Sequence, residues 1–376
     1  MRYLLMDKDI PVLSAEAART EFGGTRFVQE RQLGGSLPIG YRDMASWVRR
    51  RRAPAHRAHI AALLNRYSLA EPERYIRATR AVSLNDTFWA KEEGCALTWT
   101  DVSPYRNSFD ETIAASVFGE GAAGEPASLI SPEFGTDGAF AKRWAREGGQ
   151  AFLLKRGTEG CRKEGLVPAC EALASQVASC ICPSYAPYRA VAYHGKPASK
   201  CPLFTDEAKG YVPFERVYPG RKSPDGILGA AARHGAEDAF RRMLVLDALI
   251  LNIDRHPGNY GFLSDTGTME ILGPAPVFDL NRSLLAWEDI RDLEKRLGYC
   301  ASRYAPRIGG DFVAVARSAL TDGIRADLLP MLDFSFPDRE VGGISGRRVA
   351  ALEQVVRMQA AEILGKSRAW CPGVKG

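Results

Sequence analysis

The sequence predicts an α+β protein whose strands and helices occupy different parts of the chain. Between residues 96 and 206, short apolar segments are separated by turn residues, which is typical of strands. From Glu237 onward, apolar residues recur at helical spacing. A cluster of acids and an amide follows the first of these helices, in the motif Asp254-Arg-His-Pro-Gly-Asn259 and the triplet Val277-Phe278-Asp279. This separation of strands and helices favours an α+β fold, with the acid cluster near the start of its helical half.

Residues 1–95 are expected to form an arginine-rich helical module. Residues 3–6 are apolar enough for a short strand, and residues 14–19 begin with Ser, a favoured N-cap, so we expect a helix there. Residues 41–52 and 54–67 are predicted to be helices, as is a segment that begins at Pro72. The module therefore contains mainly helices and ends near residue 89.

Residues 49–52 are four consecutive arginines within this module. Such a basic run can attract the phosphate backbone of a nucleic acid or recruit a partner protein. Alternatively, it is the solvated face of an arginine-rich helix, as most charge runs are. Both interpretations stay open at the level of sequence.

Residues 96–206 and 207–376 are the second and third expected parts. In the second part, residues 151–155 form an apolar strand, residues 168–181 form a helix with Pro in its first turn, and residues 190–193 and 202–204 are strand-like. In the third part, the helix from Glu237 leads directly into the acid cluster, and residues 261–263 and 269–272 flank a hairpin turn. Residues 286–300 and 347–365 are amphipathic helices.

The composition is that of a soluble, intracellular protein. The chain has 376 residues, 45% of them hydrophobic, and a net charge of +5, which is less than a dedicated nucleic-acid binder carries. Its eight cysteines follow no disulfide framework and no zinc-finger spacing, so we expect reduced thiols. The first residues lack the apolar stretch of a signal peptide, and no window of about 18 residues is apolar enough to span a membrane. A cytoplasmic location without membrane partners is therefore expected.

Asp254, Asn259 and Asp279 offer the oxygen donors of a metal–phosphate centre. Pro257-Gly258 must turn the chain sharply, so the side chains of Asp254 and Asn259 can converge. In phosphoryl transfer, an acid such as Asp254 orients the attacking hydroxyl, while an amide and a second acid hold Mg²⁺ on nucleotide phosphates. His256 lies between them and either positions one of these side chains or is packed structurally. Alternatively, the acids and the amide only cap a helix end and a turn.

Three segments of residues 96–206 complete the expected site. Lys155 ends an apolar strand, where it either points inward to nucleotide phosphates, paired with Glu171 of the next helix, or faces solvent. The turn that contains Gly135, Thr136 and Gly138 can cover phosphates with its backbone amides. Thr136 or Ser131 in this turn is a candidate autophosphorylation site, although loop hydroxyls often only satisfy local turns.

The motif Asp254-Arg-His-x-Gly-Asn259 with Phe278-Asp279 resembles the catalytic loop of the HipA-like serine/threonine kinases, which phosphoinositide kinases share more distantly. Residues 83–89, residues 131–138 with Lys142, and residues 154–158 resemble a small bacterial branch of that family. The resemblance covers about residues 80–285 and is most specific in the loop 254–259.

The resemblance implies a bilobal protein-kinase-like fold with ATP between a strand-rich N-lobe, residues 96–206, and a helical C-lobe, residues 207–376. It implies that Asp254 is the catalytic aspartate, that Asn259 and Asp279 bind Mg²⁺, and that Lys155 contacts phosphate. It also implies that Phe204 and Thr205 lie near the hinge that holds adenine.

The sequence therefore predicts an ATP- and Mg²⁺-dependent kinase that phosphorylates Ser or Thr hydroxyls of a protein, with the chain itself as a candidate acceptor. Two alternatives stay open. One is a lipid or small-molecule kinase, and the other is a nucleotide-binding pseudokinase with a regulatory or DNA-associated role. A DNA or antitoxin-like partner at residues 49–52 would fit the second alternative, whereas the acceptor, a toxin role and the oligomeric state cannot be read from the sequence.

Overall fold

The computed structural model describes residues 1–376 except 22–23, 122–123, 161–162, 221 and 367–376. Its contacts divide the chain into two compact units. Unit 1 comprises Met1–Lys155, Leu203–Val212 and Leu263–Leu272, and unit 2 comprises Arg156–Pro202, Pro213–Phe262 and the chain from Gly273 onward. The boundaries predicted at residues 95 and 206 do not coincide with the ends of these units, and the three-part division stays a prediction.

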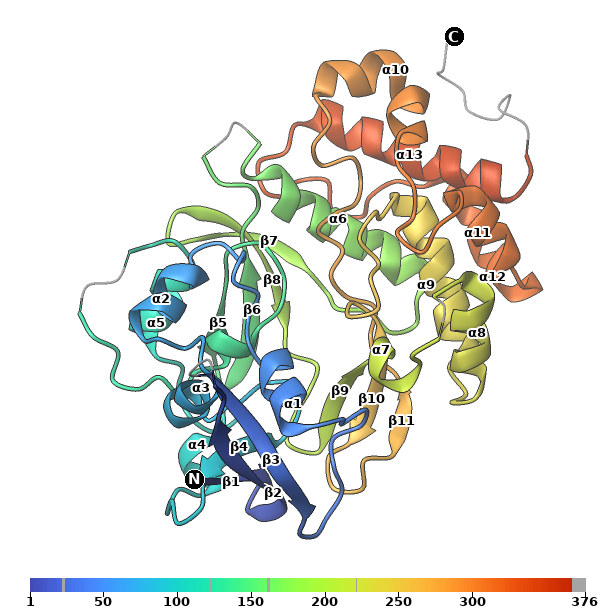
Figure 1. The fold of residues 1–376 in the computed structure, drawn as a ribbon. Helices are drawn as coiled ribbons and strands as arrows, with labels where there is room; N and C mark the ends of the chain where they lie inside the picture. The colour runs from blue at the N-terminus through green and yellow to red at the C-terminus, as the bar shows by residue number, and fades with distance from the viewer. Residues whose placement is uncertain (22–23, 122–123, 161–162, 221, 367–376) are drawn as a thin grey trace. The chain divides into compact units, whose positions relative to one another are not determined.

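Unit 1 begins with a four-stranded antiparallel sheet in the order β3-β2-β1-β4 (Figure 1). Its strands are β1 (Arg2–Asp7), β2 (Ile10–Arg19), β3 (Thr25–Gln32) and β4 (Phe88–Glu92). Tyr3, Leu5 and Val12 are fully buried in a core that also contains Trp47 and Tyr75 from the helices that follow. The sheet therefore has one face that packs against helices, as an α+β arrangement requires.

The helix predicted at residues 14–19 is wrong, because these residues form the second half of β2. Ala, Glu and Arg favour helix locally, but β1 and β3 pair with β2 on both sides and satisfy its backbone groups. Tertiary pairing therefore overrides the local preference. Residues 1–95 are consequently a sheet with helices and not a mainly helical module.

The other elements of unit 1 are mostly short. Its helices are α1 (Met44–Arg50), α2 (Ile60–Arg66), α3 (Pro72–Thr79), α4 (Trp99–Val102) and α5 (Glu111–Val117), with the 3₁₀ turn η1 (Pro132–Gly135). The antiparallel hairpin of β5 (Lys142–Glu147) and β6 (Gln150–Lys155) follows. Three further strands, β9 (Lys209–Pro213), β10 (Gly261–Asp265) and β11 (Ile271–Pro274), form a sheet in the order β11-β10-β9. A boundary between unit 1 and unit 2 falls within each of these strands. The strand predicted at residues 202–204 is not formed, since β8 ends at Pro202.

Unit 2 is mainly helical. Its helices are α6 (Leu166–Ile181), α7 (Phe214–Val217), α8 (Pro224–Ala232), α9 (Glu237–Ile250), α10 (Ile290–Ser302), α11 (Phe312–Ser318), α12 (Asp322–Leu328) and α13 (Gly346–Ile363), with the 3₁₀ turn η2 (Pro330–Asp333). It also contains the antiparallel hairpin of β7 (Arg189–Tyr193) and β8 (Lys196–Pro202). Helix α9 contacts α6, α8, α11 and α13 (Figure 1), which confirms the wide apolar face predicted for it.

Two further observations concern the described residues alone. No helix among them is long and apolar enough to cross a lipid bilayer. No disulfide joins the cysteines that the structure describes, whereas Cys161 and Cys371 lie outside the described residues.

Candidate active site

The loop that carries Asp254 begins where α9 ends. Leu251 ends this helix with φ 52°, in the left-handed region that residues other than glycine rarely adopt. This conformation turns the chain away from the helix axis. The backbone N–H of His256 then donates to the carbonyl of Asp254 at 2.7 Å, and the N–H of Asn259 donates to the carbonyl of His256 at 2.8 Å. These bonds form the tight turn that the Pro257-Gly258 pair predicts.

The side chain of Asn259 and the backbone of Asp254 are held by the loop itself. Asn259 Nδ2 donates to the carbonyl of Asp254 at 3.2 Å, so the amide group is fixed five residues from the acid. The backbone N–H of Asp254 donates to Asn252 Oδ1 at 3.1 Å. The carboxylate of Asp254 is 21% exposed and forms an ion pair with Arg307. This acid is therefore accessible to a reacting group, whereas Asn259 is buried.

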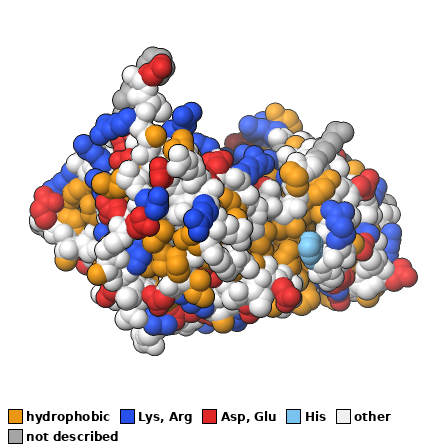
Figure 2. Space-filling view, turned by 60° about the horizontal axis from the view of Figure 1, so that its bottom comes forward, with side chains coloured by type: hydrophobic (Ala, Val, Ile, Leu, Met, Phe, Trp, Pro, Cys, Tyr) orange, Lys and Arg blue, Asp and Glu red, His pale blue; other side chains and the backbone are white. Residues whose placement is uncertain are grey.

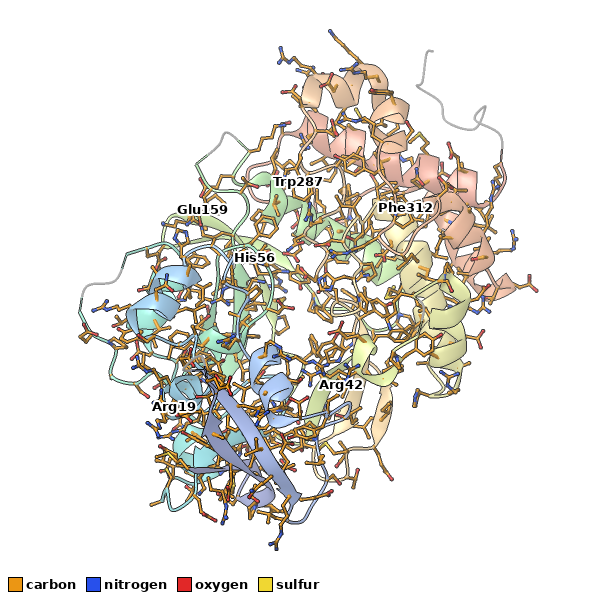
Figure 3. The ribbon with its side chains drawn as sticks, in the orientation of Figure 1. Arg19, Arg42, His56, Glu159, Trp287 and Phe312 are labelled. Carbon is orange, nitrogen blue, oxygen red and sulfur yellow. The ribbon has the colours of Figure 1, made fainter. Side chains whose placement is uncertain are left out.

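Arg282 lies near the same carboxylate, with its Nη1 atom 3.8 Å from Asp254 Oδ2. Its guanidinium stacks over the ring of Trp287, a residue labelled in Figure 3, at 5.3 Å from the ring centroid. Two guanidinium groups, those of Arg282 and Arg307, thus lie beside Asp254.

The segment that carries Asp279 follows Val277, which forms a short parallel β-bridge with Tyr185. Asp279 adopts a left-handed conformation with φ 55°, which Asp tolerates better than most residues. Its backbone N–H donates to the hydroxyl oxygen of Tyr188 at 3.1 Å. The turn after β11 thus presents Asp279 from a defined and uncommon backbone conformation.

A buried arginine, Arg255, joins the two segments. Its Nη1 atom donates to the carbonyl of Asn259 at 2.9 Å and to the carbonyl of Phe278 at 2.8 Å. On its other side, Arg255 binds both carboxylate oxygens of Asp247 at 2.9 and 2.8 Å. Burial disfavours the charged guanidinium, but the attraction of Asp247 prevails and raises the pKa of Arg255.

This arrangement places three of the predicted site residues, Asp254, Asn259 and Asp279, on one scaffold within unit 2. No role for Arg255 follows from the sequence alone. The feature of the sequence that could have pointed to it is Asp247, because an acid on the apolar face of α9 needs a buried partner. Asp247 binds the loop through the side chains of Arg255 and Asn252.

His256 contributes to the turn. Its Nδ1 atom accepts the backbone N–H of Gly258 at 3.1 Å. A Cβ at Gly258 would lie 3.0 Å from two ring atoms of His256, so this glycine makes room for the imidazole. The structure thus gives His256 a local structural role, and its catalytic assignment stays a prediction.

Lys155 is buried, with 3% of its surface exposed, so the solvent-facing alternative for this lysine is wrong. It ends β6 directly opposite Lys142 of β5, which is also buried at 4% exposure. Directly opposite residues of an antiparallel pair share one face of the hairpin. Lys142 Nζ donates to the carbonyl of Asp137 at 2.5 Å, and a Cβ on Gly138 would lie only 2.2 Å from that Nζ. The φ of 98° therefore favours glycine at position 138, and a side chain there would displace the ammonium of Lys142.

The turn that contains Gly135 and Thr136 is anchored to the segment between α1 and α2. Arg57, which is buried, donates to the carbonyls of Glu133 and Thr136 at 2.8 Å each. The hydroxyl of Thr136 donates to the carbonyl of Pro132 and accepts from Trp144 Nε1, both at 2.8 Å. A Cβ on Gly135 would lie 3.0 Å from the carbonyl oxygen of Arg51. This half of the turn expected to cover phosphates is thus firmly packed.

Both hydroxyls considered for autophosphorylation have structural partners. Ser131 is 1% exposed, and its oxygen accepts the backbone N–H of Glu133 at 3.4 Å. Thr136 makes the two bonds described above. Ser131 therefore lacks the exposure that an acceptor needs, and the hydroxyl of the half-buried Thr136 is engaged as both donor and acceptor.

Glu171, Phe204 and Thr205 are the remaining predicted residues. Glu171 is fully buried in α6, where its carboxylate accepts the hydroxyl of Ser199 in unit 2. Thr205 donates to the carbonyl of Leu84 at 2.5 Å, and the ring of Phe204 meets that of Tyr211 edge-on at 5.8 Å, both within unit 1. The Lys155–Glu171 pair would join the two units and stays a prediction, as does the adenine-binding role of Phe204 and Thr205.

The arginines at residues 49–52 are largely used within the fold. Arg51 is 3% exposed and forms an ion pair with Asp86 at 2.5 Å, and Arg52 donates to the carbonyl of Leu69 at 3.2 Å. Only Arg49 and Arg50 are exposed. Figure 2 shows a face of the molecule on which basic side chains are interspersed with acidic and hydrophobic ones. Two of the four arginines in the predicted nucleic-acid contact at residues 49–52 are thus engaged in contacts within the fold.

Comparison with known proteins defines the class of fold. No family model matches the sequence, and no curated protein matches it. Among solved structures, the chain is similar to HipA in the toxin–antitoxin complex of HipA, HipB and operator DNA from Shewanella oneidensis MR-1, with a TM-score of 0.53 and 13% identity over 97% of this chain and 98% of that chain. It is also similar to the Helicobacter pylori proinflammatory kinase CtkA, with a TM-score of 0.46 and 16% identity over 60% of this chain and 91% of that chain.

The fold is therefore that of the HipA-like kinases, and the likeness to HipA extends over nearly the whole chain. This confirms the predicted fold class and the resemblance on which it depended. At these identities the likeness concerns the fold, and the activity has to be argued from the side chains.

Proposed function

We propose that this protein is an ATP- and Mg²⁺-dependent kinase that phosphorylates Ser or Thr hydroxyls of a protein. One observation carries the proposal: Arg255 binds the backbone of both the Asp254–Asn259 loop and the Phe278–Asp279 segment. A nucleophile-orienting acid and two oxygen donors for a metal are thereby supported by one buried side chain. Phosphoryl transfer requires such an arrangement, since its catalysis depends on positioning and charge neutralisation.

Asn259 and Asp279 would hold Mg²⁺. Amide and carboxylate oxygens are the ligands that Mg²⁺ prefers, and the NH₂ group of Asn259 is already engaged with the carbonyl of Asp254. The described residues contain no group of three or more His, Cys, Asp or Glu that could hold a metal alone, which fits a cation that is shared with substrate phosphates. When bound, Mg²⁺ neutralises charge on the phosphates of the nucleotide.

Asp254 would orient the acceptor hydroxyl and accept its proton. It lies at the start of the loop, and its carboxylate is partly exposed, so a hydroxyl group can reach it. A carboxylate that only closed the turn would accept backbone N–H groups of the loop. The carboxylate of Asp254 instead binds Arg307.

Lys142 and Lys155 support the nucleotide-binding part of the proposal within unit 1. Both lysines are buried and lie directly opposite each other, on one face of the β5–β6 hairpin. Nucleotide phosphates are anions, and Lys155 is the strand lysine that the kinase template assigns to them.

The binding partner is inferred from the structural likeness to HipA. The HipA structure contains HipB and operator DNA, so an antitoxin-like partner or DNA is the candidate partner for this chain as well. The buried state of Arg51 and the packing of Arg52 argue against residues 49–52 as the main contact.

Phosphosite mapping tests the proposal. Purified wild-type protein and Asp279→Ala are incubated with ATP and Mg²⁺, alone and with a bacterial lysate whose own kinases have been inactivated by heat. The proposal predicts new phosphoserine or phosphothreonine sites with the wild type and none with Asp279→Ala. Transfer only to lipid or small-molecule acceptors would favour the first alternative, and nucleotide binding without any transfer would favour the pseudokinase.

A further inference from the structure

The peptide group between Phe278 and Asp279 is bound at both of its polar atoms. Its carbonyl oxygen accepts Nη1 of Arg255 at 2.8 Å, and its N–H donates to the hydroxyl oxygen of Tyr188 at 3.1 Å. These two contacts come from different elements, the loop after α9 and the start of the β7 hairpin. Together they fix the orientation of one peptide plane.

This peptide plane leads into Asp279, whose φ of 55° is in the left-handed region. For a residue other than glycine, that region is strained and persists only where the surroundings impose it. Rotation of the peptide would release the strain and turn the Asp279 side chain to another direction. The contacts of Arg255 and Tyr188 are those that such a rotation would break.

The side chains of Arg255 and Tyr188 are themselves held in place by further contacts. Arg255 is 2% exposed and is oriented by the two carboxylate oxygens of Asp247. Tyr188 is 6% exposed, and its backbone N–H donates to the hydroxyl of Ser175 in α6 at 3.0 Å. That hydroxyl in turn donates to the carbonyl of Ala186 at 3.0 Å, which fixes the turn before Tyr188. The peptide is thus held by preorganised groups on both sides.

We propose that Tyr188 is a positioning residue for Asp279, and that its hydroxyl, opposite Arg255, keeps the Asp279 carboxylate directed to the divalent cation. This inference rests on the proposed function, which makes Asp279 a metal ligand. Groups that orient a metal ligand without touching the metal typically change metal affinity or activity by about 10- to 100-fold when they are removed.

Tyr188→Phe is the direct test, because it keeps the buried ring and removes only the acceptor oxygen for the Asp279 N–H. Tyr260→Phe is the matched control. Tyr260 is also buried in unit 2, and within the described residues its hydroxyl has no hydrogen-bond partner. Ser175→Ala is a second variant, since it loosens the turn before Tyr188 without altering the tyrosine.

The affinity for Mn²⁺ is measured by electron paramagnetic resonance in the presence of a non-hydrolysable ATP analogue, together with the thermal unfolding midpoint of each variant. We expect Tyr188→Phe to weaken Mn²⁺ binding by about 10- to 100-fold, Ser175→Ala to weaken it less, and Tyr260→Phe to leave it unchanged. Phosphate transfer by Tyr188→Phe should recover at high Mn²⁺, which a general loss of structure would not allow.

Equal Mn²⁺ affinity in Tyr188→Phe and the wild type overturns the role of Tyr188 and leaves the proposed function intact. A similar loss in Tyr260→Phe overturns it as well, because the effect would then come from any lost hydroxyl in this core. If the wild type binds no Mn²⁺ with the nucleotide analogue, the proposed function fails together with this inference.

Discussion

The guanidinium of Arg307 forms an ion pair with the carboxylate of Asp254. Arg307 lies on the turn between α10 and α11, 53 residues after Asp254 in the chain. An acceptor hydroxyl that is oriented by Asp254 must share this carboxylate with Arg307 or displace it. The side chain of Arg307 is 55% exposed, so the pair is weak and displacement costs little.

Arg307→Ala is expected to raise the rate of phosphate transfer modestly. Exposed ion pairs contribute about 0.2–1 kcal/mol, which corresponds to an increase in kcat/KM of up to about fivefold. Steady-state kinetics at low ionic strength measure the effect. Arg303→Ala is a matched control, because Arg303 is exposed to a similar extent and pairs with Glu288. A loss of more than tenfold in Arg307→Ala would mean that Arg307 assists the transfer and does not compete with it.

Asp247→Ala is expected to destabilise unit 2 strongly. Removal of one member of a buried ion pair leaves the charge of Arg255 uncompensated, which costs about 3–5 kcal/mol. Urea unfolding monitored by fluorescence measures the change. Asp238→Ala, on the same helix, breaks a pair whose acid is 62% exposed and should cost less than about 1 kcal/mol. Equal losses in the two variants would show that the Asp247–Arg255 pair has no special role in the fold.

Glu133→Gln is expected to remove a pH dependence of stability. Burial raises the pKa of Glu133 from 4.5 to about 7, although Arg57 and the N–H of Trp144 oppose this increase. The folded chain therefore binds the proton more tightly than the unfolded chain. The stabilisation is fully present below about pH 4.5 and is lost as the pH rises through about 7.

The lost stability is on the order of 3 kcal/mol, since one pKa unit corresponds to about 1.4 kcal/mol. Glu133→Gln remains neutral at every pH, so the variant should gain stability relative to the wild type between pH 5 and pH 8, as measured by chemical denaturation at both values. Glu125→Gln, which alters a 69% exposed carboxylate, should show no such gain. A constant difference between Glu133→Gln and the wild type across this range would contradict the assignment.

Lys155→Met is expected to lower kcat by about 10²- to 10³-fold, the usual effect when a preorganised group that stabilises charge in the transition state is removed. The variant should also bind ATP more weakly, which isothermal titration calorimetry detects. Lys209→Met, a 49% exposed lysine of unit 1, is the control. Unchanged turnover in Lys155→Met would remove this lysine from the site.

The sequence predicted the features of unit 2 that depend on local chemistry. The apolar face of α9 and the Pro257-Gly258 turn depend on neighbouring residues, and the structure contains both. The same is true of the hairpin around residues 265–267, which lies in unit 1. The residues it missed are those whose partners are distant in the chain. Tyr188 contacts Asp279 across 91 positions, and no spacing in the sequence indicates that contact.

The same reason explains the errors in unit 1. The β2 strand was predicted as a helix in its second half because its pairing partners cannot be read from local propensity. The run at residues 49–52 was interpreted as a basic surface, but Arg51 is buried beside Asp86, a residue 35 positions later. A basic residue in a sequence can be assigned to the surface only where no acid from a distant part of the chain pairs with it in the fold.

Transfer of phosphate from ATP labelled in the γ position tests the central claim most directly. Wild type, Asp254→Ala and the control Asp322→Ala, an exposed acid in the first turn of α12, are incubated with Mg²⁺ and a mixture of protein acceptors. The account predicts labelled protein with the wild type and Asp322→Ala, and none with Asp254→Ala, although this variant still binds nucleotide. Undiminished transfer by a correctly folded Asp254→Ala would contradict the account.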